Sequence, residues 1–190
     1  GDSNLTPRFY VSASGSSGTL AAGDYLKDHL NTKIAVVEAT ECPTLLNNGY
    51  GEHNIQGIGD KHVPLIHNVM NTDFVIGISD QATNNLNLMF NTDIGKEYLI
   101  SKKGFDSNFV NRLPEFGFST IANILASIKL AQYMKLGADD AIITVATDGA
   151  DLYLSELEKT KEDFAGIYDE TACAEIYGQY LKGISTDNTL

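Results

Sequence analysis

A glycine- and serine-rich turn is the first place in the sequence where residue types and spacing could do chemistry. Gly15, Ser16, Ser17, Gly18 and Thr19 follow an aromatic and β-branched run, and a helical pattern begins at the last of them. Glycine lets a ligand approach the backbone, and the free N–H groups at a helix N-terminus favour anions. The turn has neither the lysine of a Walker loop nor the GxGxxG spacing of dinucleotide-binding proteins. It therefore predicts a site for a phosphate group, with a purely structural turn as the alternative.

A second polar turn, at Thr147 and Asp148, follows the apolar run over 141–146. Open α/β sheets bind ligands beyond the carboxyl ends of their strands. We therefore expect both side chains to contribute to a ligand site. The alternative for Asp148 is to cap the following turn through its own backbone.

The elements that must position these turns can be predicted from periodicity. Short β-branched and apolar runs predict strands over 9–13, 34–38, 74–78 and 141–146. Helical patterns predict helices over 19–30, from Asp80 through 90, over 119–137 and over 163–182. The predicted fold class is α/β, an open, mainly parallel twisted sheet with helices on both faces. We expect a single α/β domain over 1–190, with a loop-rich region over 47–114 near the active site and a frayed tail over 185–190.

The composition narrows the classes of function. Hydrophobic residues make up 43% of the chain, and no apolar run approaches the roughly 18 residues of a membrane span. The net charge of -12 opposes general binding to nucleic acid or to an anionic membrane surface. Cys42 and Cys173 stand in unrelated contexts, which favours a reducing compartment and a cytoplasmic protein. His62 and His67 lack the cysteine or carboxylate neighbours of a metal site, so no metal is expected.

Four segments in order resemble the cysteine synthase and cystathionine β-synthase family of fold-type-II pyridoxal-phosphate enzymes. They are GSSGT at 15–19, HNIQGIG at 53–59, GFSTIA at 117–122 and the stretch over 142–154. In that family GTGGT binds the cofactor phosphate, HKIQGIG lies beside the substrate pocket, and GISSGA opens a helix. The resemblance runs from about Phe9 to Ser155 and corresponds to the second half of such enzymes.

The resemblance implies roles for residues in the first two segments. Gly15 to Thr19 would hold the phosphate of pyridoxal 5'-phosphate, and Gln56 and Gly57 would lie near the amino-acid substrate. His53 matches the family histidine of its motif, but we expect a solvent-exposed loop histidine, with a catalytic base as the alternative. Asp60, Lys61 and His62 replace the small and apolar residues usual after QGIG, so the sequence leaves the substrate open.

The partner of the cofactor's pyridine nitrogen also stays open. The family uses a serine there, and an ungapped alignment places Gly149 at that position. A shift of one residue would bring Asp148 to the nitrogen instead, and Thr147 or a water is the further alternative. An aspartate would keep the nitrogen protonated, whereas a hydroxyl or a water would leave it neutral.

The family's Schiff-base lysine lies upstream of the phosphate turn, and no lysine here precedes residue 15. The resemblance therefore implies that the catalytic lysine is absent from this chain. We expect a C-terminal portion of a larger homodimeric enzyme, inactive without its missing N-terminal half or a partner chain. The complete enzyme would catalyse β-replacement or β-elimination on a serine- or cysteine-type amino acid.

Two other classes of function remain as alternatives. One is a non-catalytic domain that binds a phosphate ligand or assembles with another chain. The other is a nucleotide-binding domain with Glu38 at the end of its second strand, which the glycine spacing disfavours.

Overall fold

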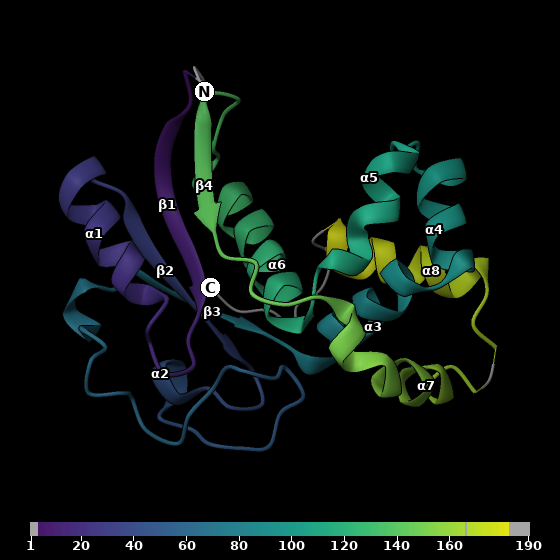
Figure 1. Cartoon of the computed structure of the whole chain (residues 1–190), viewed down its shortest axis with the longest axis horizontal. Helices are drawn as coiled ribbons and strands as arrows, with labels where there is room; N and C mark the ends of the chain where they lie inside the picture. Colours follow the sequence, from purple (N-terminus) through teal and green to yellow (C-terminus); the bar gives the residue numbers. More distant parts are fainter. Residues whose placement is uncertain (1–3, 166, 183–190) are drawn as a thin grey trace. The chain divides into compact units, whose positions relative to one another are not determined.

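The chain forms two compact units, seen in a computed structural model that describes residues 4–165 and 167–182 (Figure 1). The first unit contains the residues up to Asp80 together with Ala122–Val145. The second contains Gln81–Ile121 and Ala146–Ser185. The sequence analysis expected one domain over 1–190. The periodicity of a single helix or strand shows which of its faces is buried, but it does not show which other elements it packs against.

A parallel sheet forms the centre of the first unit. Its strands are β1 (Thr6–Ala13), β2 (Lys33–Ala39), β3 (Phe74–Ile78) and β4 (Asp140–Thr144). They pair in the order β3-β2-β1-β4, and every pairing is parallel. The apolar runs that predicted the strands supply the core, with Val11, Val36 and Val37 fully buried. The predicted α/β class is confirmed.

Two long helices flank this sheet from opposite sides (Figure 1). Helix α1 (Leu20–Leu30) ends where Asn31 adopts a left-handed conformation, with φ of 56°. Gly23 lets α1 approach β1 closely, because a Cβ atom there would lie 2.6 Å from the Tyr10 ring. Helix α6 (Phe118–Met134) contributes Asn123, whose side chain accepts from Ala13 N at 2.7 Å and donates to Val145 O at 3.0 Å.

The connection from β2 to β3 is mostly irregular. It contains the short helix α2 (Thr44–Asn47) and a 3-10 turn at Val69–Asn71. The segment is fixed from within the unit, because the backbone N–H groups of Asn54 and Ile55 both donate to the Asp80 carboxylate. Ile55 and Ile58 are buried.

The second unit is helical. It contains most of α3 (Asp80–Asn91) and the helices α4 (Asp93–Glu97), α5 (Ser107–Arg112), α7 (Leu154–Glu162) and α8 (Glu170–Ile176), with π-helical turns at Tyr98–Lys102 and Tyr177–Leu181. Much of the predicted loop-rich region over 47–114 is thus helix after residue 80. Polar side chains that suggested loops cap these short helices: Thr92 accepts from Gly95 N, and Asp106 accepts from Phe109 N.

The predicted helix over 163–182 is wrong in its first part. Ala165 adopts a left-handed conformation with φ of 52°. The Asp169 side chain then caps α8 by accepting from Thr171 N and Ala172 N. Helix α7, before this break, was not predicted. The predicted tail over 185–190 lies outside the described residues, and no helix within the described ranges is long and apolar enough to cross a membrane.

Candidate functional site

Hydroxyl groups fix the turn between β1 and α1. Ser14 N donates to Val37 O at 3.1 Å, which continues the β1–β2 pairing by one residue. Ser12 Oγ donates to Thr19 Oγ1 at 2.8 Å, and Tyr10 OH donates to Thr19 O at 2.7 Å. Side chains of β1 therefore hold the end of the turn from its buried side.

The backbone N–H groups of Gly15, Ser16, Ser17, Gly18 and Thr19 have no hydrogen-bond acceptor in the described part of the chain. They directly precede α1, which has 11 residues, so the positive end of the helix dipole adds to their effect. The amides form a backbone cradle whose unmet donors suit an anion with several oxygens.

Gly18 leaves the outer side of the cradle open. A Cβ atom at that position would meet only Ser16 Oγ, at 3.9 Å. Ser17 lies on the inner side, buried, with φ of 66° and its Oγ 3.2 Å from Ser14 Oγ. Left-handed backbone costs a non-glycine residue about 1–2 kcal/mol, so the fold holds Ser17 in this conformation against its local preference.

The segment over 53–59 lies against the turn at 15–19. Gly59 N donates to Ser14 O at 2.8 Å, and Gly57 and Gly59 have φ of 77° and 78°. Gln56 and Gly57 are exposed beside the turn. The expectation of a solvent-exposed His53 is wrong, because the side chain is half-buried and its ring packs on Gly59.

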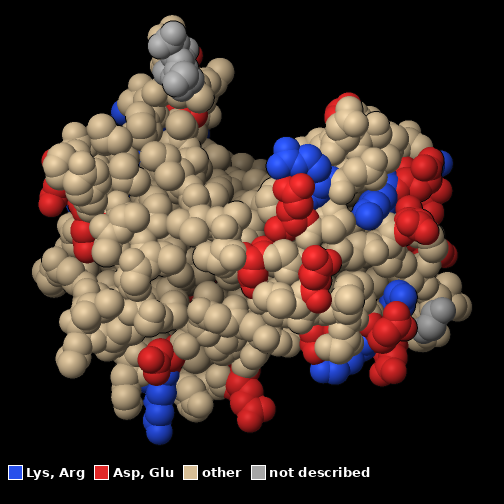
Figure 2. Space-filling view, viewed as in Figure 1, with Lys and Arg blue, Asp and Glu red and all other residues tan. Residues whose placement is uncertain are grey.

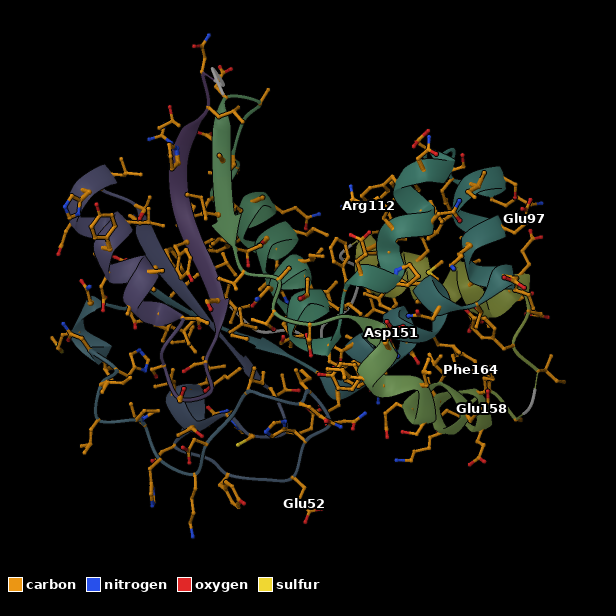
Figure 3. All side chains as sticks on the ribbon, viewed as in Figure 1. Glu52, Glu97, Arg112, Asp151, Glu158 and Phe164 are labelled. Atoms are coloured by element: carbon orange, nitrogen blue, oxygen red, sulfur yellow. The ribbon has the colours of Figure 1, made fainter. Side chains whose placement is uncertain are left out.

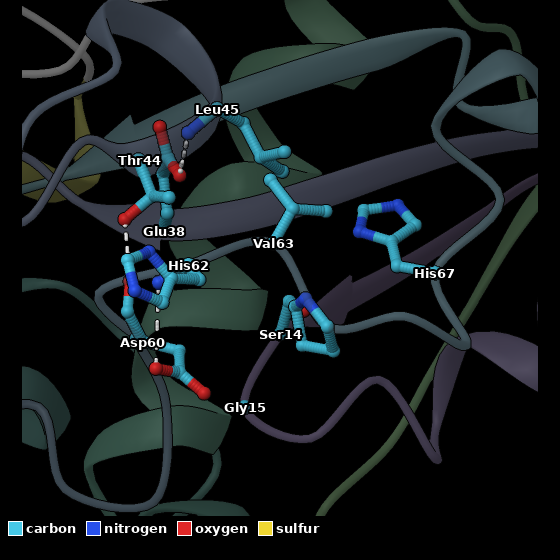
Figure 4. Close-up of a pocket in the computed structure, with 11 residues that line it drawn as sticks. Ser14, Gly15, Glu38, Thr44, Leu45, Asp60, His62, Val63 and His67 are labelled. Carbon is cyan, nitrogen blue, oxygen red and sulfur yellow. Dashed lines mark hydrogen bonds between the residues drawn. The ribbon is translucent and has the colours of Figure 1, made fainter.

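A small cavity lies next to Ser14 and Gly15, at the start of the turn. Its volume is about 20 Å³, and His62 and His67 also line it (Figure 4). That is room for about one water. This cavity is too small for a phosphate group.

Glu38, which also lines this cavity, is engaged by the protein. Its carboxylate accepts from Leu45 N at 2.9 Å and Leu46 N at 2.8 Å, at the start of α2 (Figure 4). Burial raises the pKa of Glu38, and these two amide donors oppose the shift. Glu38 therefore anchors the start of α2.

The histidines near this cavity have separate environments. His67 Nε2 lies 3.0 Å from Thr72 Oγ1, and burial lowers the pKa of His67. His62 is exposed. Within the described ranges no group of three or more His, Cys, Asp or Glu side chains is arranged to hold a metal ion.

Thr147 and Asp148 belong to the second unit, where hydroxyls surround the carboxylate. Asp148 Oδ1 accepts from Ser119 Oγ at 3.4 Å and from Thr147 Oγ1 at 3.3 Å. Asp148 Oδ2 accepts a short hydrogen bond from Tyr153 OH. Burial, followed by this contact with Asp148, raises the pKa of Tyr153.

Gly117 completes this group. Gly117 N donates to Asp148 O at 2.9 Å, and a Cβ atom at Gly117 would lie 2.5 Å from Asp148 Oδ1. The last two sequence segments of the resemblance therefore meet at Asp148. The capping alternative is not what the structure shows, since no side chain caps the 3-10 turn at Ala150–Tyr153. Ser119 and Tyr153 were not predicted as site residues.

Comparisons with known proteins agree on one family. No protein-family model matches the chain. Cysteine synthase B of Campylobacter jejuni is 32% identical over 148 residues, which is 77% of this chain and 42% of that protein. The fold is similar to isoform 3 of the O-acetylserine sulfhydrylase of Entamoeba histolytica, with a TM-score of 0.64 and 25% identity over 90% of this chain and 45% of that one.

A second solved structure with a similar fold is that of an enzyme with a different activity. The O-acetylserine-dependent cystathionine β-synthase of Helicobacter pylori has a TM-score of 0.57 and 28% identity, over 80% of this chain and 43% of that one. The chain thus spans less than half the length of each of these relatives.

Proposed function

Because sequence and fold make this chain a member of the cysteine synthase family of fold-type-II pyridoxal-phosphate proteins, we propose that it is the phosphate-binding portion of a pyridoxal-phosphate enzyme. The complete enzyme carries out β-replacement or β-elimination on a serine- or cysteine-type amino acid. The single observation that carries the proposal is the set of unpartnered amides over 15–19 at the start of α1.

The residues present fit the phosphate group of this cofactor. Five consecutive backbone N–H groups have no acceptor within the described residues, and the space that a Cβ atom at Gly18 would fill is open. The visible face of the first unit carries few charged side chains (Figure 2), so the net charge of -12 is not concentrated there. Each charge-assisted hydrogen bond contributes about 1.5–3 kcal/mol.

When bound, pyridoxal phosphate supplies an electron-withdrawing ring for the amino-acid substrate. In this proposal the amides over 15–19 bind and orient its phosphate. Gln56 and Gly57, which lie beside the turn, bind the substrate.

Asp148 is the proposed partner of the ring nitrogen, with Thr147 as its neighbour. Support comes from the three hydroxyls of Ser119, Thr147 and Tyr153, which orient the carboxylate. A fixed carboxylate holds a proton on a ring nitrogen better than the serine hydroxyl of the family does.

The lysine of the reaction is proposed to come from outside these 190 residues. None of the eleven lysines stands where the family's lysine would, upstream of the turn at 15–19. We infer that the complete enzyme is a cytoplasmic homodimer and that this chain alone is inactive. Cys42 and Cys173 are both free and buried, which fits a reducing compartment.

The test is backbone amide exchange in the whole chain, with and without pyridoxal phosphate. The proposal expects slower exchange at the amides of 15–19, with inorganic phosphate giving a weaker version of the same pattern. Protection by phosphate without added protection by the cofactor would favour the alternative, a non-catalytic phosphate-binding domain. No protection at these amides by either compound would overturn the proposal.

A further inference from the structure

One segment of the first unit exposes an unusual amount of apolar side chain. It belongs to the irregular connection from β2 to β3, along the lower edge of the first unit in Figure 1. The exposed fraction is 105% for Leu65, 70% for Ile66 and 93% for Met70. Exposed apolar side chains gathered in this way mark a place where another surface binds. We call them the apolar surface, which consists of Val63, Leu65, Ile66, Val69 and Met70.

Polar groups of the same stretch hold its backbone in place. The half-buried His67 has its Nε2 3.0 Å from Thr72 Oγ1. The side chain of Asn71 donates a short hydrogen bond to Asp24 of α1, and its carbonyl oxygen accepts from Lys27 Nζ of the same helix at 2.7 Å. The apolar side chains are therefore presented by an anchored backbone. A partner would lose little binding free energy to ordering this segment.

The stretch also lacks charge. No Asp, Glu, Lys or Arg stands between Lys61 and Asp73 in a chain whose net charge is -12. Charged side chains such as Glu97, Arg112 and Glu158 extend from helices of the second unit instead (Figure 3), and the visible face of that unit carries many others (Figure 2). The centres of protein interfaces are depleted of charged residues and enriched in methionine. The apolar surface has this composition.

The charge of the whole chain bears on which partner fits. Two copies of this chain each carry -12, so faces rich in carboxylates repel one another when two copies meet. The apolar surface lets two copies meet without this repulsion. Most oligomers of a single chain are two-fold symmetric, with the same patch contributed by both copies. An uncharged apolar patch meets this condition, because it is complementary to itself.

We propose that the apolar surface docks against the same surface of a second copy of this chain, in a two-fold dimer. The inference rests on the proposed function, because it assigns a surface to the homodimer inferred there. Val63 and His67 line the same small cavity as Ser14 and Gly15, so the apolar surface begins beside the turn at 15–19. The dimer contact and the anion site are thus neighbours within each copy.

Sedimentation equilibrium of the whole chain over a range of concentrations measures the dimer dissociation constant. We expect the native chain to dimerise, and amide exchange over 63–70 to slow as the concentration rises. Leu65→Asp should raise the dissociation constant at least about tenfold, because the substitution enters a symmetric interface twice and introduces two carboxylates. The fold of each copy should stay intact, because Leu65 is fully exposed within one copy.

Leu152→Asp is the matched control, because Leu152 is 72% exposed but lies in the 3-10 turn Ala150–Tyr153 of the second unit. It adds the same charge and should leave the dimer unchanged. A chain that stays monomeric up to millimolar concentration, or a dimer that Leu65→Asp weakens no more than Leu152→Asp does, would overturn the inference. Amide exchange over 15–19 with phosphate in the same samples separates the two claims. A dimer without phosphate protection overturns the proposed function, whereas a monomer with intact phosphate protection overturns only this inference.

Discussion

A Cβ atom at Gly15 would lie 2.5 Å from the carbonyl oxygen of Gly57. The turn that follows β1 and the segment that contains Gln56 are therefore in direct backbone contact. Two stretches separated by about forty residues in the chain form one continuous surface beside the unpartnered amides.

Because of this contact, an alanine should destabilise the fold more at Gly15 than at Gly18. Gly15→Ala should lower the free energy of unfolding by about 1–3 kcal/mol, because the new methyl group overlaps a backbone atom that cannot rotate away. Gly18→Ala should change it by less than about 1 kcal/mol, because its Cβ position is open. Urea denaturation measures both, and equal losses in the two variants would show that the contact with Gly57 is not close.

The hydroxyl of Tyr153 is predicted to stabilise the second unit through Asp148. Tyr153→Phe leaves Asp148 Oδ2 without its short hydrogen bond in a largely buried setting, which should cost about 1–3 kcal/mol. Tyr133→Phe is the control, since Tyr133 is 65% exposed. Thermal and urea unfolding compare the two, and a Tyr153→Phe variant as stable as the control would contradict the arrangement around Asp148.

Glu38 should make the free energy of unfolding depend on pH, and its raised pKa fixes the direction. Burial raises its pKa in the folded state above the ordinary value of 4.5, so the contribution of Glu38 to stability is complete below that value and is lost as pH rises through the raised pKa. The unfolding free energy of the native chain minus that of Glu38→Gln should therefore be largest in acid and decrease toward neutral pH. Urea denaturation over pH 4 to 7 measures this difference.

The opposite pH dependence of this stability difference would contradict a raised pKa for Glu38. A difference that grows as pH rises would show that the amide donors of Leu45 and Leu46 outweigh the cost of burying the charge. Glu38 would then be an ordinary anchored carboxylate with a lowered pKa.

Much of the first unit can be predicted from its sequence. The run that predicted β2 is rich in buried β-branched residues, and those of β1 and β3 are largely apolar and buried, so their identity favours both strand formation and a place in the core. The β4 run is apolar but only half-buried. The turn at 15–19 could be predicted because glycine and serine after a strand favour a turn, whereas its role as a phosphate site stays a prediction.

The parts that could not be predicted depend on contacts between distant residues. Ser119 lies 29 positions before Asp148, and Tyr153 lies 5 positions after it, and neither spacing marks a hydrogen bond to a carboxylate. The division into two units is equally a property of tertiary contacts. The error over 163–182 arose because Asp169 was counted inside a helix, whereas its side chain caps one.

The proposed absence of the catalytic lysine predicts a negative chemical result. After incubation of the whole chain with pyridoxal phosphate and reduction with borohydride, no single lysine should carry a stoichiometric adduct, because the family's lysine lies upstream of the turn and no lysine here precedes residue 15. Peptide mass spectrometry reads this out across all eleven lysines. One lysine modified to completion would place the catalytic residue inside this chain.

The most direct test of the anion site is the affinity of the whole chain for pyridoxal phosphate in a Gly18→Val variant. Gly137→Val is the matched control, because a Cβ atom there also meets nothing closer than 3.8 Å and Gly137 has no place in the turn. The account predicts at least about tenfold weaker binding in Gly18→Val, from loss of one or more charge-assisted hydrogen bonds, and native affinity in Gly137→Val. Equal affinity in Gly18→Val and the native chain would contradict the assignment of residues 15–19 as the phosphate site.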